Sequence, residues 1–129
     1  MNKTVAKIKE YLRPGKPLVI LGPYGCGKFE CLSQAIQAAG LKRYPCRISY
    51  AEYTALGLRK WAKSIPGNGV LAIDEIDRAN PVEIDFILEQ ARHPDRIMVL
   101  VGRSLPTELS YQGLNVISFV GEYPYELKE

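Results

Sequence analysis

Gly22-Pro23-Tyr24-Gly25-Cys26-Gly27-Lys28 is the stretch that predicts the fold of this chain most directly. It follows the apolar run Leu18–Leu21, which is typical of a buried strand, and it precedes a segment with the pattern of a helix. Glycines in such a turn let backbone N–H groups curl around an anion, and a lysine at the start of the helix adds a positive charge. We therefore expect this loop, with the adjoining Phe29, to bind nucleotide phosphates, and Lys28 to reach the outer phosphates.

Phe29 occupies the position directly after the lysine, where loops of this kind usually have Ser or Thr. That hydroxyl normally supplies one oxygen to Mg²⁺, a cation that prefers a near-octahedral set of oxygen ligands. A phenyl ring has no oxygen to offer. The sequence therefore predicts that nucleotide binding depends only weakly on Mg²⁺.

Length and composition are typical of one globular domain that covers residues 1–129. Hydrophobic residues make up 47% of the chain and charged residues 24%, and the net charge is +3. This mild positive charge permits DNA as a partner but does not by itself indicate it. The three cysteines show no disulfide framework or zinc spacing, and no run is apolar enough for a signal peptide or a membrane span. We expect a cytoplasmic protein with reduced thiols and no membrane partner.

Apolar runs alternate with amphipathic segments along the chain, which predicts a parallel α/β sheet covered by helices on both faces. In such sheets ligands bind at the carboxyl ends of the strands. The glycine loop, Asp74-Glu75 and Arg103 each follow an expected strand, so we expect them to meet at one edge. The expected strands are 18–21, a segment around 47–49 within 44–50, 70–73, 97–101 and 116–120, and the expected helices are 3–12, 28–39, 51–64 and 81–91, the last with Asn80 as N-cap.

The acidic pair Asp74-Glu75 follows the apolar run Val70–Ile73 and suits metal-assisted hydrolysis. Asp74 would hold Mg²⁺ directly or through water, and Glu75 would orient and deprotonate the attacking water. The alternative is a pair of solvated acids that opens a charged loop, because residues 74–78 read Asp-Glu-Ile-Asp-Arg. The position of the pair, after a buried strand and downstream of a phosphate loop, favours the catalytic interpretation.

Together these motifs resemble the AAA+ branch of the P-loop ATPases. Residues 18–28 are similar to that family's first strand and Walker A loop, and residues 70–78 are similar to its Walker B strand. The resemblance implies a three-layer αβα sandwich around a five-stranded parallel sheet in the order 5-1-4-3-2. It also implies ATP or ADP as the ligand, with Mg²⁺ made doubtful by Phe29.

The resemblance also implies roles for single residues. Asp74 would be the acid on the metal side, Glu75 the base, and Lys28 the cation that assists catalysis at the phosphates. Arg103 or Ser104 would occupy the sensor position after the strand 97–101, from which Arg103 could contact the terminal phosphate.

The chain departs from the family pattern in further respects. Residues 106–115 contain no arginine, so the usual arginine finger is absent there, and the sequence given ends where the family's helical lid would begin. A complete ring motor is therefore not expected from this chain alone, although a homo-oligomer or a protein partner stays open.

Two hypotheses of different classes follow. The first is a nucleotide-binding AAA+-like protein with slow Mg-assisted ATP hydrolysis, coupled to remodelling or loading of a partner, with DNA as one candidate. The second is a non-catalytic binding or assembly protein on a degenerate ATPase scaffold.

Overall fold

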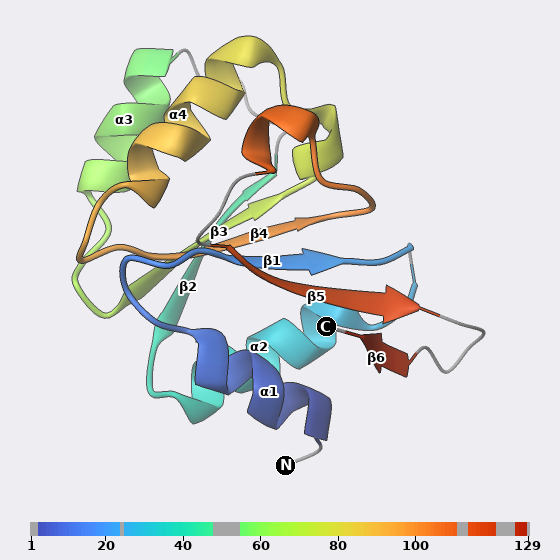
Figure 1. Ribbon diagram of the computed structural model, residues 1–129. Helices are drawn as coiled ribbons and strands as arrows, with labels where there is room; N and C mark the ends of the chain where they lie inside the picture. The colour runs from blue at the N-terminus through green and yellow to red at the C-terminus, as the bar shows by residue number, and fades with distance from the viewer. Residues whose placement is uncertain (1–2, 24, 48–54, 111–113, 121–125, 129) are drawn as a thin grey trace.

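The computed structural model describes residues 3–23, 25–47, 55–110, 114–120 and 126–128, and it has the predicted α/β class, with helices on both faces of one sheet (Figure 1). The strands are β1 (Leu18–Leu21), β2 (Lys42–Arg47), β3 (Gly69–Asp74), β4 (Ile97–Gly102), β5 (Asn115–Val120) and β6 (Glu126–Lys128). The helices are α1 (Lys3–Tyr11), α2 (Lys28–Ala38), α3 (Ala55–Lys63) and α4 (Pro81–Ala91), with the short 3₁₀ helices η2 (Ile76–Arg78) and η3 (Thr107–Leu109). None of these described helices is long and apolar enough to cross a membrane.

The strands are arranged in the order β2-β3-β4-β1-β5-β6. The first five are parallel to their neighbours, so the predicted order 5-1-4-3-2 is confirmed when the sheet is read from its other edge. The sixth strand pairs antiparallel with β5 and was not predicted. Its three residues, Glu-Leu-Lys, are too few to form a recognisable apolar pattern.

The second strand overlaps the predicted segment 44–50 but begins two residues earlier. The sequence favoured a strand centred on 47–49, whereas β2 runs from Lys42 to Arg47 and residues 48–54 lie outside the described part of the chain. β2 is an edge strand whose backbone pairs with β3 from Lys42 opposite Gly69 onward. It is held by this ladder rather than by an apolar pattern of its own, and an edge position tolerates Pro45.

Most helix boundaries agree with the sequence. α4 begins at Pro81 as expected, and Asn80 caps it in a reciprocal pair of hydrogen bonds: Glu83 N donates to Asn80 Oδ1 at 2.9 Å and Asn80 N donates to Glu83 Oε1 at 2.9 Å. The helix predicted for 51–64 is described as α3 from Ala55 to Lys63, and residues 51–54 lie outside the described residues.

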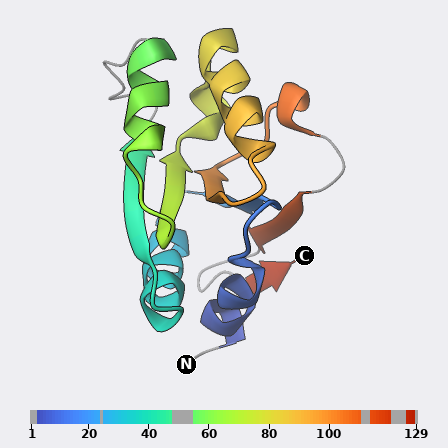
Figure 2. The same ribbon diagram turned by 90° about the vertical axis from the view of Figure 1, so that its left-hand side faces the viewer.

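Figure 2 shows the sheet between the two pairs of helices, and an apolar layer packs on each face of the sheet. Side chains alternate along β1, so Leu18 and Ile20 face α1 and α2 while Val19 faces the opposite layer. The α1–α2 layer also contains Val5, Ile8, Leu32, Ala35, Ile36, Val99 and Ile117. The α3–α4 layer contains Ala62, Ile65, Leu71, Ile73, Ile84, Phe86, Ile87, Met98, Leu100 and Leu109. This two-sided packing explains the near-continuous apolar runs of β1, β3 and β4.

Candidate functional site

The predicted site segments leave the sheet at one edge. The backbone register aligns Asp74 with Val101 and Val101 with Ile20, so β3, β4 and β1 end level with one another. One step beyond, Gly22 N donates to Gly102 O at 3.0 Å, which holds the start of the glycine loop beside the end of β4. The loop, the acidic pair and the segment after β4 therefore emerge side by side, as the sequence predicted.

The glycine loop needs glycine for its backbone conformation. Gly25 has φ 76° and Gly27 has φ 86°, both in the left-handed region that favours glycine. A Cβ built at either position meets no atom within 4 Å, so the constraint is conformational and not steric. Tyr24, predicted to bind the cofactor, lies outside the described residues.

Lys28, the first residue of α2, folds back over this loop. The residue is only 5% exposed, and its Nζ donates a hydrogen bond to Pro23 O at 3.0 Å. Nζ also lies 5.9 Å from the centroid of the Phe29 ring. A positive charge with so little water around it interacts strongly with any anion that approaches, because the surrounding effective dielectric constant is low.

The N-terminus of α2 adds donors to the same place. The helix has eleven residues, its N-cap is Gly27, and no described side chain caps its first turn. The first N–H groups of a helix lack partners within the helix and carry partial positive charge. Together with Lys28, this end of α2 has the features of a phosphate-binding helix N-terminus.

The Phe29 ring packs into the protein. It is half-buried and lies against the core layer beneath α1 and α2. The side chain therefore contributes to packing at the start of α2, and it provides no oxygen ligand at the loop.

The acidic pair has a strained geometry. Glu75 adopts φ 62° and ψ 38°, and it is the single non-glycine residue with positive φ among the described residues. Its backbone N donates to Asp74 Oδ1 at 2.7 Å. The Glu75 side chain is almost buried, and its Oε2 lies 3.4 Å from Arg78 Nη1. Such strain costs about 1–3 kcal/mol and is often found at functional sites.

The donors for a protein-held Mg²⁺ are few. No group of three His, Cys, Asp or Glu side chains converges among the described residues. Asp74 offers carboxylate oxygens at the strand end, Phe29 offers none, and Glu75 is engaged by Arg78. The residues thus fit a phosphate group well. They do not supply the hydroxyl oxygen that loops of this type normally give to Mg²⁺.

Arg103 is held by a residue that the sequence did not single out. Arg103 N donates to Asp77 Oδ1 at 3.1 Å, and Arg103 Nε lies 3.7 Å from Asp77 Oδ2. Asp77 lies in η2, directly after the acidic pair. The charged run 74–78 hinted at a loop, but nothing in it indicated which distant residue Asp77 would contact.

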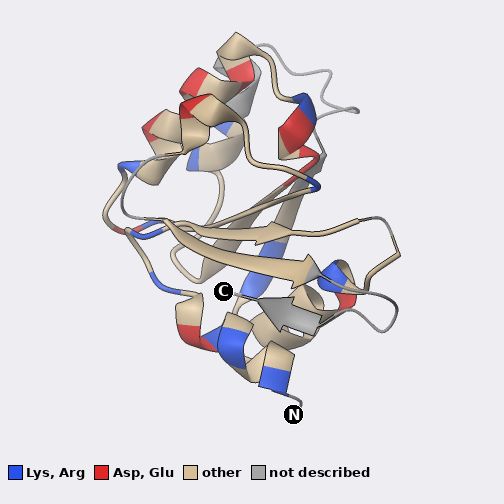
Figure 3. Cartoon of the chain, turned by 45° about the vertical axis from the view of Figure 1, so that its right-hand side comes forward, with Lys and Arg blue, Asp and Glu red and all other residues tan. Residues whose placement is uncertain are grey.

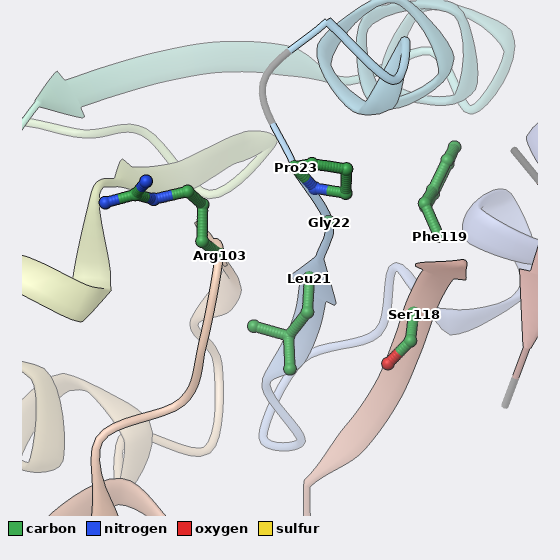
Figure 4. Close-up of a pocket in the computed structure, with 6 residues that line it drawn as sticks. All are labelled: Leu21, Gly22, Pro23, Arg103, Ser118 and Phe119. Carbon is green, nitrogen blue, oxygen red and sulfur yellow. The ribbon is translucent and has the colours of Figure 1, made fainter. Parts of the chain in front are cut away.

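A cavity of about 340 Å³ adjoins the glycine loop. As Figure 4 shows, it is lined from three strands: Leu21 at the end of β1 with Gly22 and Pro23 after it, Arg103 after β4, and Ser118 and Phe119 on β5. Its walls are mostly apolar, with one guanidinium and one hydroxyl. Because Pro23 O also accepts the Lys28 hydrogen bond, the cavity and the loop share a wall. The sequence did not point to the β5 residues.

The chain matches no protein-family model, and no curated protein is significantly similar to it. A nucleotide site is therefore supported by the residues and their geometry alone.

Proposed function

We propose that this protein binds ATP or ADP, with the phosphates at residues 22–28 and the start of α2, and hydrolyses ATP slowly. Gly25 and Gly27 would present backbone N–H groups, and Lys28 would neutralise the outer phosphates. By its resemblance to AAA+ proteins it would act in the cytoplasm on a partner that is remodelled or loaded, with DNA as one candidate. A homo-oligomer is part of the same proposal.

The observation that carries the proposal is the buried ammonium of Lys28. Burying a charge is costly unless it is compensated, and here a backbone carbonyl from the loop itself supplies a hydrogen bond at 3.0 Å. The surrounding donors are backbone N–H groups at the end of an α-helix, which also favour an anion. A phosphate group matches both features.

Slow hydrolysis is proposed because two groups work against a fast reaction. Phe29 withholds a metal ligand, and the Glu75 carboxylate lies 3.4 Å from Arg78 Nη1. A carboxylate that contacts a guanidinium is less available to orient and activate the attacking water. Arg103, at the edge of the cavity, would meet the terminal phosphate.

Thermal unfolding with and without ATP or ADP tests the binding. We expect stabilisation of about 2.7 kcal/mol when the nucleotide is present at about 100 times its Kd. Lys28→Met keeps much of the side-chain length without the charge and should lose this stabilisation. Lys9→Met, at an exposed position of α1, is the matched control and should keep it. Equal shifts in the parent and Lys28→Met would contradict the assignment.

The second candidate is a non-catalytic nucleotide-binding or assembly protein, and the Glu75–Arg78 pair favours it together with Phe29. ATP turnover measured in the parent, Glu75→Gln and Arg78→Gln separates the two. A hydrolase should lose turnover in Glu75→Gln and gain it in Arg78→Gln, since that variant releases the base. Nucleotide binding with no turnover in any of the three would support the non-catalytic candidate.

A further inference from the structure

A second cavity, of about 530 Å³, lies between α4 and η3. It is lined by Pro81, Ile84, Asp85 and Leu88 of α4 and by Glu108 of η3, so it shares no residue with the glycine loop. The α4 residues are three or four positions apart and therefore lie along one face of the helix. They extend over eight residues, a length of about 10 Å along the axis.

The floor of this groove is apolar. Ile84 and Leu88 belong to the α3–α4 core layer, and the three-residue η3 covers α4 only in part. Val82 of the same helix is 51% exposed, the most exposed of the large hydrophobic residues described. An open cavity with an apolar floor is a feature of surfaces that another chain covers.

The rim of the groove is acidic. α4 contains Glu83, Asp85 and Glu89 and no lysine or arginine, although the protein as a whole carries a net charge of +3. Glu83 is used in the helix cap, and Glu89 Oε2 lies 2.9 Å from Arg59 Nε of α3. Figure 3 shows the acidic residues along α4, with basic residues on the neighbouring α3 and along α1 at the other end of the molecule.

Asp85 and Glu108 differ from the other acids of this region. No ion pair involves either carboxylate among the described residues, and Asp85 and Glu108 are both exposed. They lie at the groove on two different elements, α4 and η3. A ligand with apolar groups at its centre and positive charges at its edges would therefore complement the groove.

We propose that this groove binds an amphipathic helical segment of a partner protein, with aliphatic side chains against Ile84 and Leu88 and lysine or arginine opposite Asp85 and Glu108. The groove runs along two turns of α4, and a partner helix lying in it would face these turns with its own i, i+4 and i+7 side chains. The positive charges would direct and orient the partner, and the aliphatic contacts would supply most of the affinity.

A labelled synthetic peptide tests the proposal by fluorescence anisotropy. The probe is a helix of about four turns with leucine on one face and lysine beside it, and the control peptide has glutamate in place of every lysine. We expect the full chain to bind the lysine peptide and not the glutamate peptide. Binding should weaken as salt increases, because exposed charges are screened.

Charge reversal locates the binding surface. Asp85→Lys and Glu108→Lys should each raise the Kd for the lysine peptide by about tenfold or more, because like charges would then face each other. Glu10→Lys, at an exposed acid of α1, makes the same change in net charge and should leave the Kd unchanged. Because the two test residues lie on different elements, a folding defect in one variant does not remove the test.

Three outcomes would overturn the proposal. Equal Kd values in Asp85→Lys, Glu108→Lys and Glu10→Lys would show that the peptide responds to net charge only. Binding of the glutamate peptide would show that Asp85 and Glu108 do not select a positively charged partner. Concentration-dependent self-association of the parent, abolished by Asp85→Lys in sedimentation, would assign the groove to a second copy of this chain instead of a partner protein.

Discussion

Arg103 and Asp77 are joined by two contacts, one from the backbone of Arg103 and one from its side chain. Arg103 N donates to Asp77 Oδ1 at 3.1 Å, while Nε lies 3.7 Å from Oδ2. The Asp77 side chain is 12% exposed and that of Arg103 52% exposed, so the carboxylate is the more buried partner. This pair ties the segment after β4 to η2, and it thereby sets the position of Arg103 at the cavity beside the glycine loop.

We expect Asp77→Ala to lower the free energy of unfolding by about 1–2 kcal/mol, because the Arg103 backbone donor loses a charged acceptor. Asp77→Asn keeps an oxygen that can accept this hydrogen bond and loses only a solvent-exposed ion pair, so its effect should be smaller. Urea unfolding of the two variants measures the difference. Equal losses would mean that the ion pair, and not the backbone hydrogen bond, holds the segment.

The packing around Gly22 leaves no room for a larger side chain. A Cβ at this position would lie 2.8 Å from Cys26 Sγ and 3.0 Å from Phe119 Cβ, so Gly22→Ala should destabilise the protein by about 1–3 kcal/mol. Cys26→Ala removes the nearer atom. In the double variant the loss should therefore be less than the sum of the two single losses, which a double-mutant cycle of unfolding free energies measures. Strictly additive losses would contradict a contact between these two positions.

Phe29→Thr restores the hydroxyl that loops of this type offer to Mg²⁺. We expect the ratio of nucleotide Kd values without and with Mg²⁺ to rise in this variant, because the metal gains an inner-sphere oxygen. Phe29→Leu keeps an apolar side chain at the same position and is the control, which should behave like the parent. Calorimetric titration measures the ratio. A strong Mg²⁺ dependence already present in the parent would contradict our account of Phe29.

Cys31 should react slowly with iodoacetamide at neutral pH. Burial raises the pKa of its thiol, and the Glu30 carboxylate and Cys26 raise it further, so little of the reactive thiolate is present. The unfolded chain releases this proton at a lower pH than the folded protein does. The thiol therefore stabilises the folded state at pH values below its ordinary pKa, and this contribution is lost as the pH rises through the raised pKa of the folded protein.

The pH profile of Cys31 alkylation, followed by mass spectrometry, tests this environment. Glu30→Gln removes a negative charge and should move the profile to lower pH, whereas Glu10→Gln should leave it in place. An unchanged profile in Glu30→Gln would exclude Glu30 as a cause of the shift.

Short-range patterns in the sequence were enough for much of the fold. Leu18–Leu21, the glycines of residues 22–27 and the cap at Asn80 are local signals, because apolar runs, turn residues and N-caps act on their own neighbourhood. They predicted a parallel sheet and the edge at which the candidate site lies, whereas the strand order came from the resemblance to AAA+ proteins. The start of β2 at Lys42 was not predicted, because an edge strand draws its stability from hydrogen bonds to β3, a partner that the segment itself does not reveal.

The sequence by itself therefore determined that a glycine loop followed by Lys28 stands between a strand and a helix in a parallel α/β sheet. Only the tertiary structure decided that Asp77 holds Arg103, 26 positions away, and that β5 contributes to a cavity beside the loop. The physical reason is that local conformation depends on neighbouring residues, whereas side-chain contacts between distant segments depend on how the strands are ordered and how their ends pack.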